Sequence, residues 1–230
     1  FQQTCERVAY EVDLYTVTDP DYFGGDEENL ALIDETWDWV EQNIAVGTQA
    51  LRTSCHELLP ASLWLSVLVP FVAQVFVRGS DWIPRFAARF AWMKEHDLEL
   101  HALAGSPDNA NLARLMELQR LMPAMMAARW QVLHCPPESD LVVNDLGRVA
   151  MVHDRGMQGY TIPLDRRAAL TVSRAERGSR IIWDQTREDW FVDGIEHFDL
   201  TPDDVDGLNA ALRRGALVES YGPTRGLVEG

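Results

Sequence analysis

The sequence predicts a protein of the α+β class, in which an N-terminal helical part packs on a C-terminal antiparallel sheet with one late helix. Apolar residues recur at helical spacing up to about residue 128. From about residue 129, short runs rich in β-branched and aromatic residues alternate with Pro, Gly or Asp turns. Helices first and strands second is the order of an α+β fold, and 230 residues fit a single domain, 1–230.

Four helices are predicted in the helical part. They cover the segments 26–45, 56–80, 80–96 and 106–130. The first carries acids in its first turn, where the helix dipole favours them, and one apolar stripe. The second has Pro60 near its start, Pro70 as a kink and Gly79 as its stop. Pro84 and Pro107 fall in the first turns of the third and fourth helices, where proline is tolerated.

The β-rich part contains six short runs with strand character. These runs are 130–135, 140–145, 148–154, 160–164, 168–173 and 179–184. The late helix begins after Thr201, because Pro202 occupies the first helical position and Asp204 stands three residues after the cap. Residues 215–220 then form a possible edge strand.

The formal net charge of −16 limits the choice of partners. Residues 1–50 alone hold twelve acids and one base, a net of −11. Such a surface repels phosphates and anionic membranes, so broad nucleic-acid binding and membrane association are disfavoured. A small-molecule or protein partner is expected instead.

The run Leu58–Val77 contains twenty residues without a charge. That length would just span a bilayer, but the run contains two serines, a glutamine and two prolines, and aromatic residues do not frame both of its ends. We therefore expect a buried core helix. Three scattered cysteines without a CxxC pair indicate a reducing, cytoplasmic environment.

Two polar residues end this helix on one face. Gln74 and Arg78 are four residues apart, so they are neighbours on the helix surface. Arg78 can complement the helix dipole or pair with an acid from the first 50 residues. Alternatively, both side chains line a polar pocket beside the core, where hydrogen bonds strengthen.

A second candidate region is the segment DLVVNDLGRVAMVHD. Its first apolar run ends in Asn144 and Asp145, turns at Gly147 and returns as residues 148–153, which predicts a hairpin with a carboxylate at the rim of the sheet. Asn and Asp are also favoured by turn chemistry alone.

Common catalytic and metal motifs do not occur in the sequence. It contains no HExxH, GxSxG, P-loop or GxGxxG pattern. Two Cys-His neighbours exist, Cys55-His56 and His134-Cys135. Adjacent strand residues point to opposite faces, so His134 and Cys135 are poorly placed to share a zinc ion.

Several segments together resemble the bacterial domain-of-unknown-function family 4238. The segments are YEVDLYTV, VAQVFVRGSDW, LVVNDLGRV, YTIPLDRRAALTVS and LTPDDVDGLNAALRRGALVES. The family has no settled activity, but its polar motifs are similar to those of small-molecule or phosphodiester hydrolases. The positions of this sequence that match those motifs are Glu11, Gln74, Arg78, Asp145 and Asn209. Here Asn144 replaces a Ser, Gly147 replaces a Pro, and the family's upstream His segment does not occur.

Two functions follow from these observations. The first is a hydrolase-like site for a small anionic or phosphodiester substrate, with Glu11, Asp145 and Arg78 as catalytic residues. Glu11 and Asp145 could also hold a divalent metal ion, and Gln74, Asn144 and Asn209 would bind substrate. The second is a non-catalytic interaction or regulatory module with an acidic binding face, in which the same polar residues satisfy one another in the core.

Overall fold

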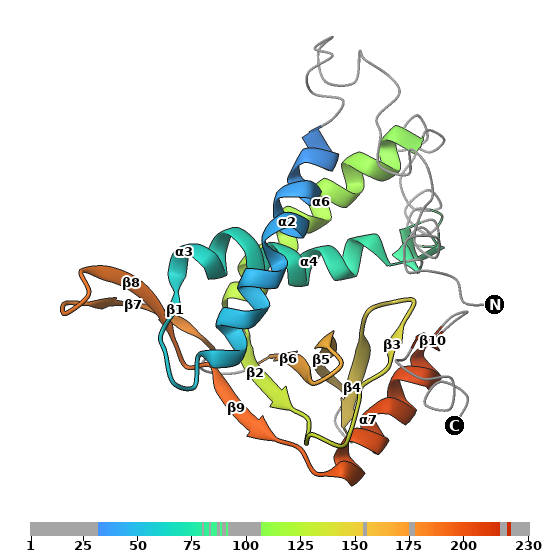
Figure 1. Cartoon of the computed structure of the whole chain (residues 1–230). Helices are drawn as coiled ribbons and strands as arrows, with labels where there is room; N and C mark the ends of the chain where they lie inside the picture. Colours follow the sequence, from blue (N-terminus) through green and yellow to red (C-terminus); the bar gives the residue numbers. More distant parts are fainter. Residues whose placement is uncertain are drawn as a thin grey trace.

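The computed structural model describes residues 32–79, 81–82, 84–86, 88, 91, 107–153, 156–174, 178–216 and 220–221. Its helices are α2 (Leu32–Thr53), α3 (Ala61–Leu63), η3 (Trp64–Leu68), α4 (Val69–Arg78), α6 (Pro107–Met126) and α7 (Pro202–Gly215). Its strands are β1 (Leu59–Pro60), β2 (Arg129–His134), β3 (Val143–Asn144), β4 (Val149–His153), β5 (Gly156–Asp165), β6 (Ala168–Ser173), β7 (Arg180–Asp184), β8 (Asp189–Asp193), β9 (Glu196–Asp199) and β10 (Ser220–Tyr221). This order confirms the α+β class (Figure 1).

The uncharged run forms a core helix, as the sequence predicts. α3, η3 and α4 follow one another without a break, and the window from Ala61 to Arg78 has a mean hydropathy of 1.6 with 61% of it buried. Trp64, Leu68 and Val72 are at most 1% exposed. The π-helical turn η3 ends two residues before Pro70, whose ring would clash with a carbonyl one turn earlier in a regular α-helix. This burial by neighbouring elements is that of a core helix.

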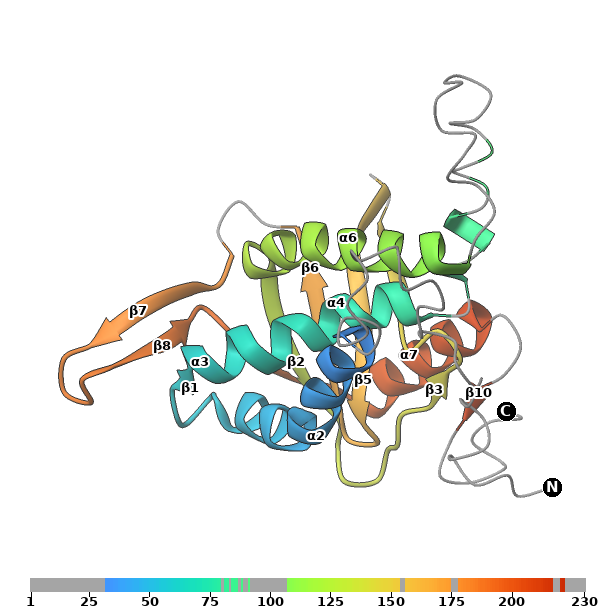
Figure 2. The same ribbon diagram turned by 90° about the horizontal axis from the view of Figure 1, so that it is seen from above.

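The five-stranded sheet has the order β4-β5-β6-β2-β9. Its neighbouring strands are antiparallel except for β2 and β9, which are parallel, so the sheet is mixed. Trp130 and Leu170 point into the core formed with η3 and α4, where Trp130 meets Trp64 edge-on at a centroid distance of 5.7 Å. Seen from above, α4 and α6 lie across this face of the sheet (Figure 2).

α7 covers the opposite face of the sheet. Successive strand residues point to opposite faces, so Ala169 turns away from Leu170 and packs with Leu141 and Val205. The predicted capping box at the start of α7 is present: the Thr201 hydroxyl accepts from the backbone N–H of Asp204, whose carboxylate accepts from the backbone N–H of Thr201. The sheet is therefore enclosed between α7 and the helices of the N-terminal part.

β7 and β8 form a hairpin that projects from the body of the protein (Figure 1). A third strand lies beside the hairpin only at its base, where β1 pairs with Phe191 and Val192 of β8. Within the described residues, nothing is paired alongside the distal part of the hairpin. The sequence predicts only the first strand of this hairpin, at 179–184, and the structure adds β8.

The structure differs from the sequence prediction around Gly147. The turn exists, because the Gly147 N–H donates to the Asn144 carbonyl at 2.9 Å and Gly147 has a φ of 63°. However, β3 pairs with β10, and β4 pairs with β5. The expected hairpin ladder between these two strands is therefore wrong. The predicted helix over 80–96 lies mostly outside the described residues.

Two glycines provide a matched test of this fold. A Cβ on Gly207, in the exposed middle of α7, would meet nothing within 4 Å. Gly207→Ala should raise the free energy of unfolding by about 0.5–1 kcal/mol, because it removes the helix cost of glycine. A Cβ on Gly159 would lie 2.7 Å from Ser173 Cα and collide with the Val172 carbonyl. Gly159→Ala should lower stability in the same urea titration; a loss at Gly207 would contradict the placement of α7.

Candidate functional site

Gln74 and Arg78 lie on α4 but face different surroundings. The Arg78 guanidinium forms an ion pair with Glu41 of α2 and lies 5.5 Å from the centre of the Trp37 ring. This pair joins α4 to α2 and bears out the pairing of Arg78 with an acid of the first 50 residues. Gln74 is 3% exposed, and its Nε2 has no hydrogen-bond partner within the described part of the chain.

Asn144 and Asn209 are brought together between the 140–148 segment and α7. Asn144 donates to the carbonyls of Arg148 and Leu212, both at 3.0 Å, and accepts from the Arg148 N–H at 3.1 Å. Asn209 accepts from the Val142 N–H at 2.9 Å and donates to the Asp140 carbonyl at 2.8 Å. Both amides thus satisfy buried backbone groups, which explains why they are 2% and 1% exposed.

Only one of the two predicted carboxylates lies among the described residues. Asp145 is half-buried in the turn after β3, and Glu11 lies outside the described residues. Among the side chains that the structure describes, no group of three or more His, Cys, Asp or Glu could hold a metal ion. The catalytic and metal-binding roles of Glu11 and Asp145 stay predictions.

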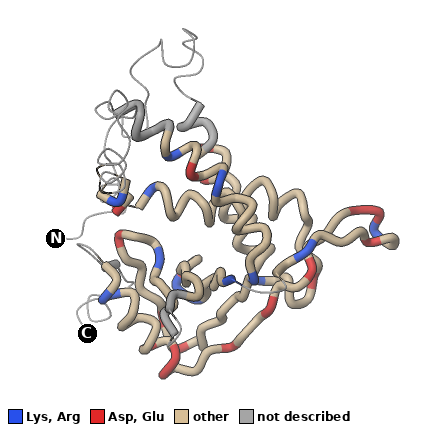
Figure 3. Tube along the Cα trace, turned by 180° about the vertical axis from the view of Figure 1, so that it is seen from behind, with Lys and Arg blue, Asp and Glu red and all other residues tan. Residues whose placement is uncertain are grey.

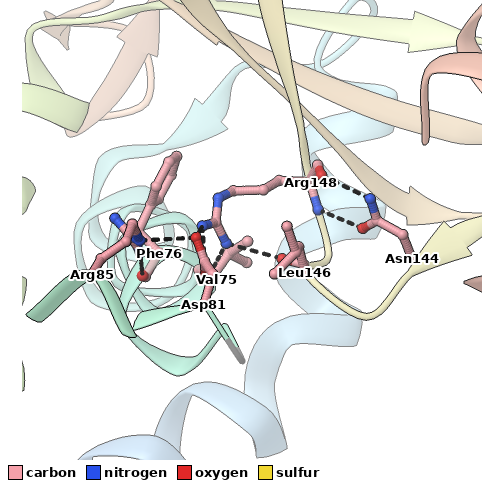
Figure 4. A network of polar contacts seen from close by, with 7 residues as sticks. All are labelled: Val75, Phe76, Asp81, Arg85, Asn144, Leu146 and Arg148. Atoms are coloured by element: carbon pink, nitrogen blue, oxygen red, sulfur yellow. Dashed lines mark hydrogen bonds and ion pairs between the residues drawn. The ribbon is translucent and has the colours of Figure 1, made fainter. Parts of the chain in front are cut away.

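A buried arginine that the sequence analysis missed organises this region. The Arg148 side chain is 6% exposed, and its Nη2 donates to both carboxylate oxygens of Asp81 at 2.9 and 2.8 Å (Figure 4). Its Nη1 donates to the carbonyls of Val75 and Leu146, and its guanidinium lies 4.9 Å from the centre of the Phe76 ring. Arg148 therefore joins the turn before β4 to the C-terminal end of α4, where the helix dipole favours a cation.

Asp81 shares its charge between two arginines. Arg85 Nε lies 2.8 Å from the Asp81 carboxylate, and Arg85 Nη2 donates to the Phe76 carbonyl at 2.9 Å (Figure 4). Gly79 leaves the room for this arrangement, because a Cβ there would lie 2.7 Å from Asp81 Oδ1 and 2.8 Å from Arg148 Nη1. The network fixes Arg85 beside Phe76, half exposed to solvent.

Arg85 and Phe76 are part of the wall of a pocket between α4, α6 and β5. Its volume is about 220 Å³. The lining residues are Phe76, Trp82, Arg85, Glu117, Arg120, Leu121, Met125 and Tyr160. Phe76 and Tyr160 meet edge-on at a centroid distance of 4.6 Å. The pocket thus combines aromatic walls with two guanidinium groups, one carboxylate and one phenol.

Both arginines keep a donor group for a ligand. Arg120 binds Glu117 through Nε at 2.8 Å and through Nη2 at 2.5 Å. Arg85 uses Nε and Nη2 in the contacts given above. Within the described residues, neither Nη1 makes a hydrogen bond. The hydrogen bond and charge of Glu117 raise the pKa of Arg120, so this side chain stays cationic.

Arg85, Arg120 and Tyr160 carry no functional signal in the sequence, because each occurs in a segment with an ordinary packing explanation. Charged residues on a helix face solvent by default, and Tyr160 opens a predicted strand. Only the fold brings α4, α6 and β5 to one pocket. Comparisons of the chain with protein-family models, curated proteins and solved structures find no match. The resemblance to family 4238 therefore stays a prediction.

The Arg148 network gives a stability prediction. Arg148→Ala should lower the free energy of unfolding by about 3 kcal/mol or more, because it removes a buried partner of Asp81 and leaves buried carbonyls unsatisfied. Arg180→Ala is the matched control, since its ion pair with Asp193 has side chains 74% and 40% exposed. The control should change stability by about 0–1 kcal/mol in the same urea titration. Equal losses in the two variants would show that Arg148 has no special structural role.

Proposed function

We propose that the protein binds a small anionic organic molecule in the pocket between α4, α6 and β5. The observation that carries this proposal is the position of two guanidinium groups at one aromatic-walled pocket, each with an Nη1 that makes no hydrogen bond to the described residues. Phosphate and carboxylate groups are the anions that such planar donors bind best. The aromatic side chains supply the apolar contact that an organic molecule needs.

Charge supports a small ligand over a polymer. The protein as a whole carries a net charge of −16, which repels long polyanions. Counting the lining residues, the pocket holds two bases and one acid. A small anion needs only this local field, whereas a nucleic acid would have to cross the acidic surface as well.

The network behind the pocket reduces the cost of binding. Arg85 is held by Asp81 and by the Phe76 carbonyl, and Phe76 itself is covered by Arg148. A donor held in place before binding loses little side-chain freedom when the ligand arrives. This gives the predicted site residues nearby a supporting role: Asn144 fixes the backbone of Arg148.

Hydrolysis of the bound molecule is the reaction class that the sequence predicts, and it is part of this proposal. Glu117 and Tyr160 are the side chains in the pocket wall that can transfer protons. A cytoplasmic location also belongs to the proposal. It is supported by the free state of Cys55 and Cys135 in the described part of the protein.

Binding can be tested with phenyl phosphate as probe and phenol as its neutral counterpart. Wild-type protein should bind phenyl phosphate more tightly than phenol in isothermal titration calorimetry, because only the phosphate engages both arginines. The single variant Arg120→Gln and the double variant Arg85→Gln/Arg120→Gln should each weaken phenyl phosphate binding by about tenfold or more. A hydrogen bond to a charged group contributes about 1.5–3 kcal/mol.

Arg180→Gln serves as the control for a general loss of positive charge, because Arg180 lies on the projecting hairpin. It should leave the affinity for phenyl phosphate unchanged. Equal affinity for phenyl phosphate and phenol, or equal effects of Arg120→Gln and Arg180→Gln, would contradict an anion site in this pocket.

One feature favours the second candidate function, an interaction module. Trp183 and Trp190 pair across the β7–β8 hairpin, with ring centroids 5.2 Å apart, and remain 47% and 52% exposed. The tip between them, residues 184–189, holds three acids and one arginine, and Figure 3 shows these charges at the end of the arm. Exposed tryptophans beside acids suit a basic protein segment with an apolar anchor.

A random peptide library tests this surface. Selection on the wild-type protein should enrich peptides that combine Lys or Arg with an apolar residue, and the variant Trp183→Ser/Trp190→Ser should lose at least about tenfold in affinity for them. Trp39→Ser is the control, because Trp39 is 55% exposed on α2, away from the arm. Enrichment that survives the double variant would exclude the hairpin as the binding surface.

A further inference from the structure

A chain of three polar side chains crosses from α2 to the edge of the sheet. Ser54 Oγ lies 2.9 Å from His197 Nε2. His197 Nδ1 lies 2.9 Å from His134 Nε2, and the two imidazole planes differ by 14°. No local sequence motif encodes this group, because His197 lies 63 residues from His134 and 143 residues from Ser54.

Three elements fix the chain in place. Ser54 directly follows the end of α2, where its N–H donates to the Leu51 carbonyl. His134 ends β2, and His197 lies in β9, the parallel neighbour of β2. An ion pair at this end of the sheet, Arg52 with Asp165 at 2.6 Å, holds α2 against β5. The three side chains are thus set by helix and strand ends rather than by a loop.

The hydrogen-bonded group of Ser54, His197 and His134 is separate from the pocket between α4, α6 and β5. Tyr160 of that pocket lies level with Trp130, because both pair with Val172. His134 lies at the other end of β2, about 13 Å further along the strand by the rise per residue. The chain and the pocket therefore lie at opposite ends of β2.

We propose that Ser54 is a nucleophile, with His197 as its general base and His134 as a positioning residue, in a second site that acts on small esters. A hydroxyl within hydrogen-bond distance of a base that a third group orients is the recurring arrangement of nucleophilic catalysis. Here a second histidine stands where a carboxylate usually orients the base.

The protonation states required by this role are available. The pKa of His197 is lowered by burial, and further by His134 of β2 and His56 after α2, while Asp199 of β9 raises it. A neutral His197 with its proton on Nδ1 donates to His134 Nε2 and accepts the Ser54 proton at Nε2. The Ser54 hydroxyl also lies 2.7 Å from the Leu51 carbonyl. It must turn from that carbonyl to His197 before it reacts.

Solvent reaches this site. Ser54, His134 and His197 are each partly exposed, and residues 55–58 next to the serine are exposed. A small ester can therefore approach Ser54 Oγ directly. A site at the protein surface suits small or extended esters whose carbonyl carbon is accessible.

The reaction is balanced as follows. Ser54 Oγ bonds to the carbonyl carbon while its proton passes to His197 Nε2. The bond from that carbon to the alcohol oxygen then breaks, and the alcohol leaves with the proton. Water attacks the acyl-serine, gives one proton to His197, and releases the carboxylic acid as Ser54 Oγ recovers that proton.

A fluorophosphonate probe tests the nucleophile on the full-length protein. Ser54 Oγ should bond to phosphorus as fluoride leaves, and mass spectrometry should locate the probe on Ser54. His197→Gln should slow this labelling by about 100-fold, the lower range for loss of a general base. Ser62→Ala is the matched control: Ser62 is an exposed serine on α3, and its loss should leave the labelling rate unchanged.

The pH profile separates catalysis from a structural role of the histidines. Labelling should rise with pH as His197 loses its proton. Because His134 lowers the pKa of His197, His134→Gln should move the midpoint of this rise to higher pH. Circular dichroism checks that each variant is folded. No labelling of Ser54 in the folded wild type, or labelling at the same rate in His197→Gln, would overturn the proposal.

This outcome is independent of the anion pocket. Arg120→Gln should leave labelling of Ser54 unchanged, because Arg120 lines the pocket at the far end of β2. A failure of phenyl phosphate binding together with labelled Ser54 would remove the anion site and keep the serine centre. Phenyl phosphate binding without labelling of Ser54 would remove the serine centre and keep the anion site.

Discussion

The region around the C-terminal end of α4 depends on the buried cation of Arg148. A guanidinium that is 6% exposed requires acceptors on every side, and Arg148 finds them on three separate pieces of chain: a helix end, the Asp81 carboxylate and its own turn. Removing a charge from water is costly unless it is paired and hydrogen-bonded. The end of α4, the turn before β4 and the position of Arg85 are therefore linked, because none can move without exposing or orphaning this group.

The Arg148 network supports only one of the two proposed sites, because the sites lie at opposite ends of β2. At one end of β2, the Arg148 network and Phe76 support the wall of the anion pocket. At the other end, the hydrogen bonds of His197 to Ser54 and His134 lie beside the partly exposed ion pair of Arg52 with Asp165. The Arg148 pair is buried and the Arg52 pair is not, so salt will weaken the second pair more than the first.

Sequence reasoning recovered the features that depend on local pattern. The stripe containing Trp37 and Val40, the buried run around Val72, and the cap at Thr201 each follow from spacing alone. It did not recover β8 and β9, since Asp189 and Glu196 open them with charged residues and their pairing is decided by distant strands. Arg148 looked like a strand residue after a turn. Its carboxylate partner lies 67 residues away, and no local signal encodes that distance.

The parallel pairing of β2 with β9 has a consequence for how the chain assembles. Gln131 pairs with Glu196 and His134 with Asp199, so this edge of the sheet closes only after all the intervening strands exist. During synthesis β2 must wait with one hydrogen-bonding edge open, while β6 can already occupy the other. Open edges attract other extended chains, and late closure of a distant pair slows folding. The edge of β2 that β9 later covers is therefore the part of this sheet that is open to wrong pairing for the longest time.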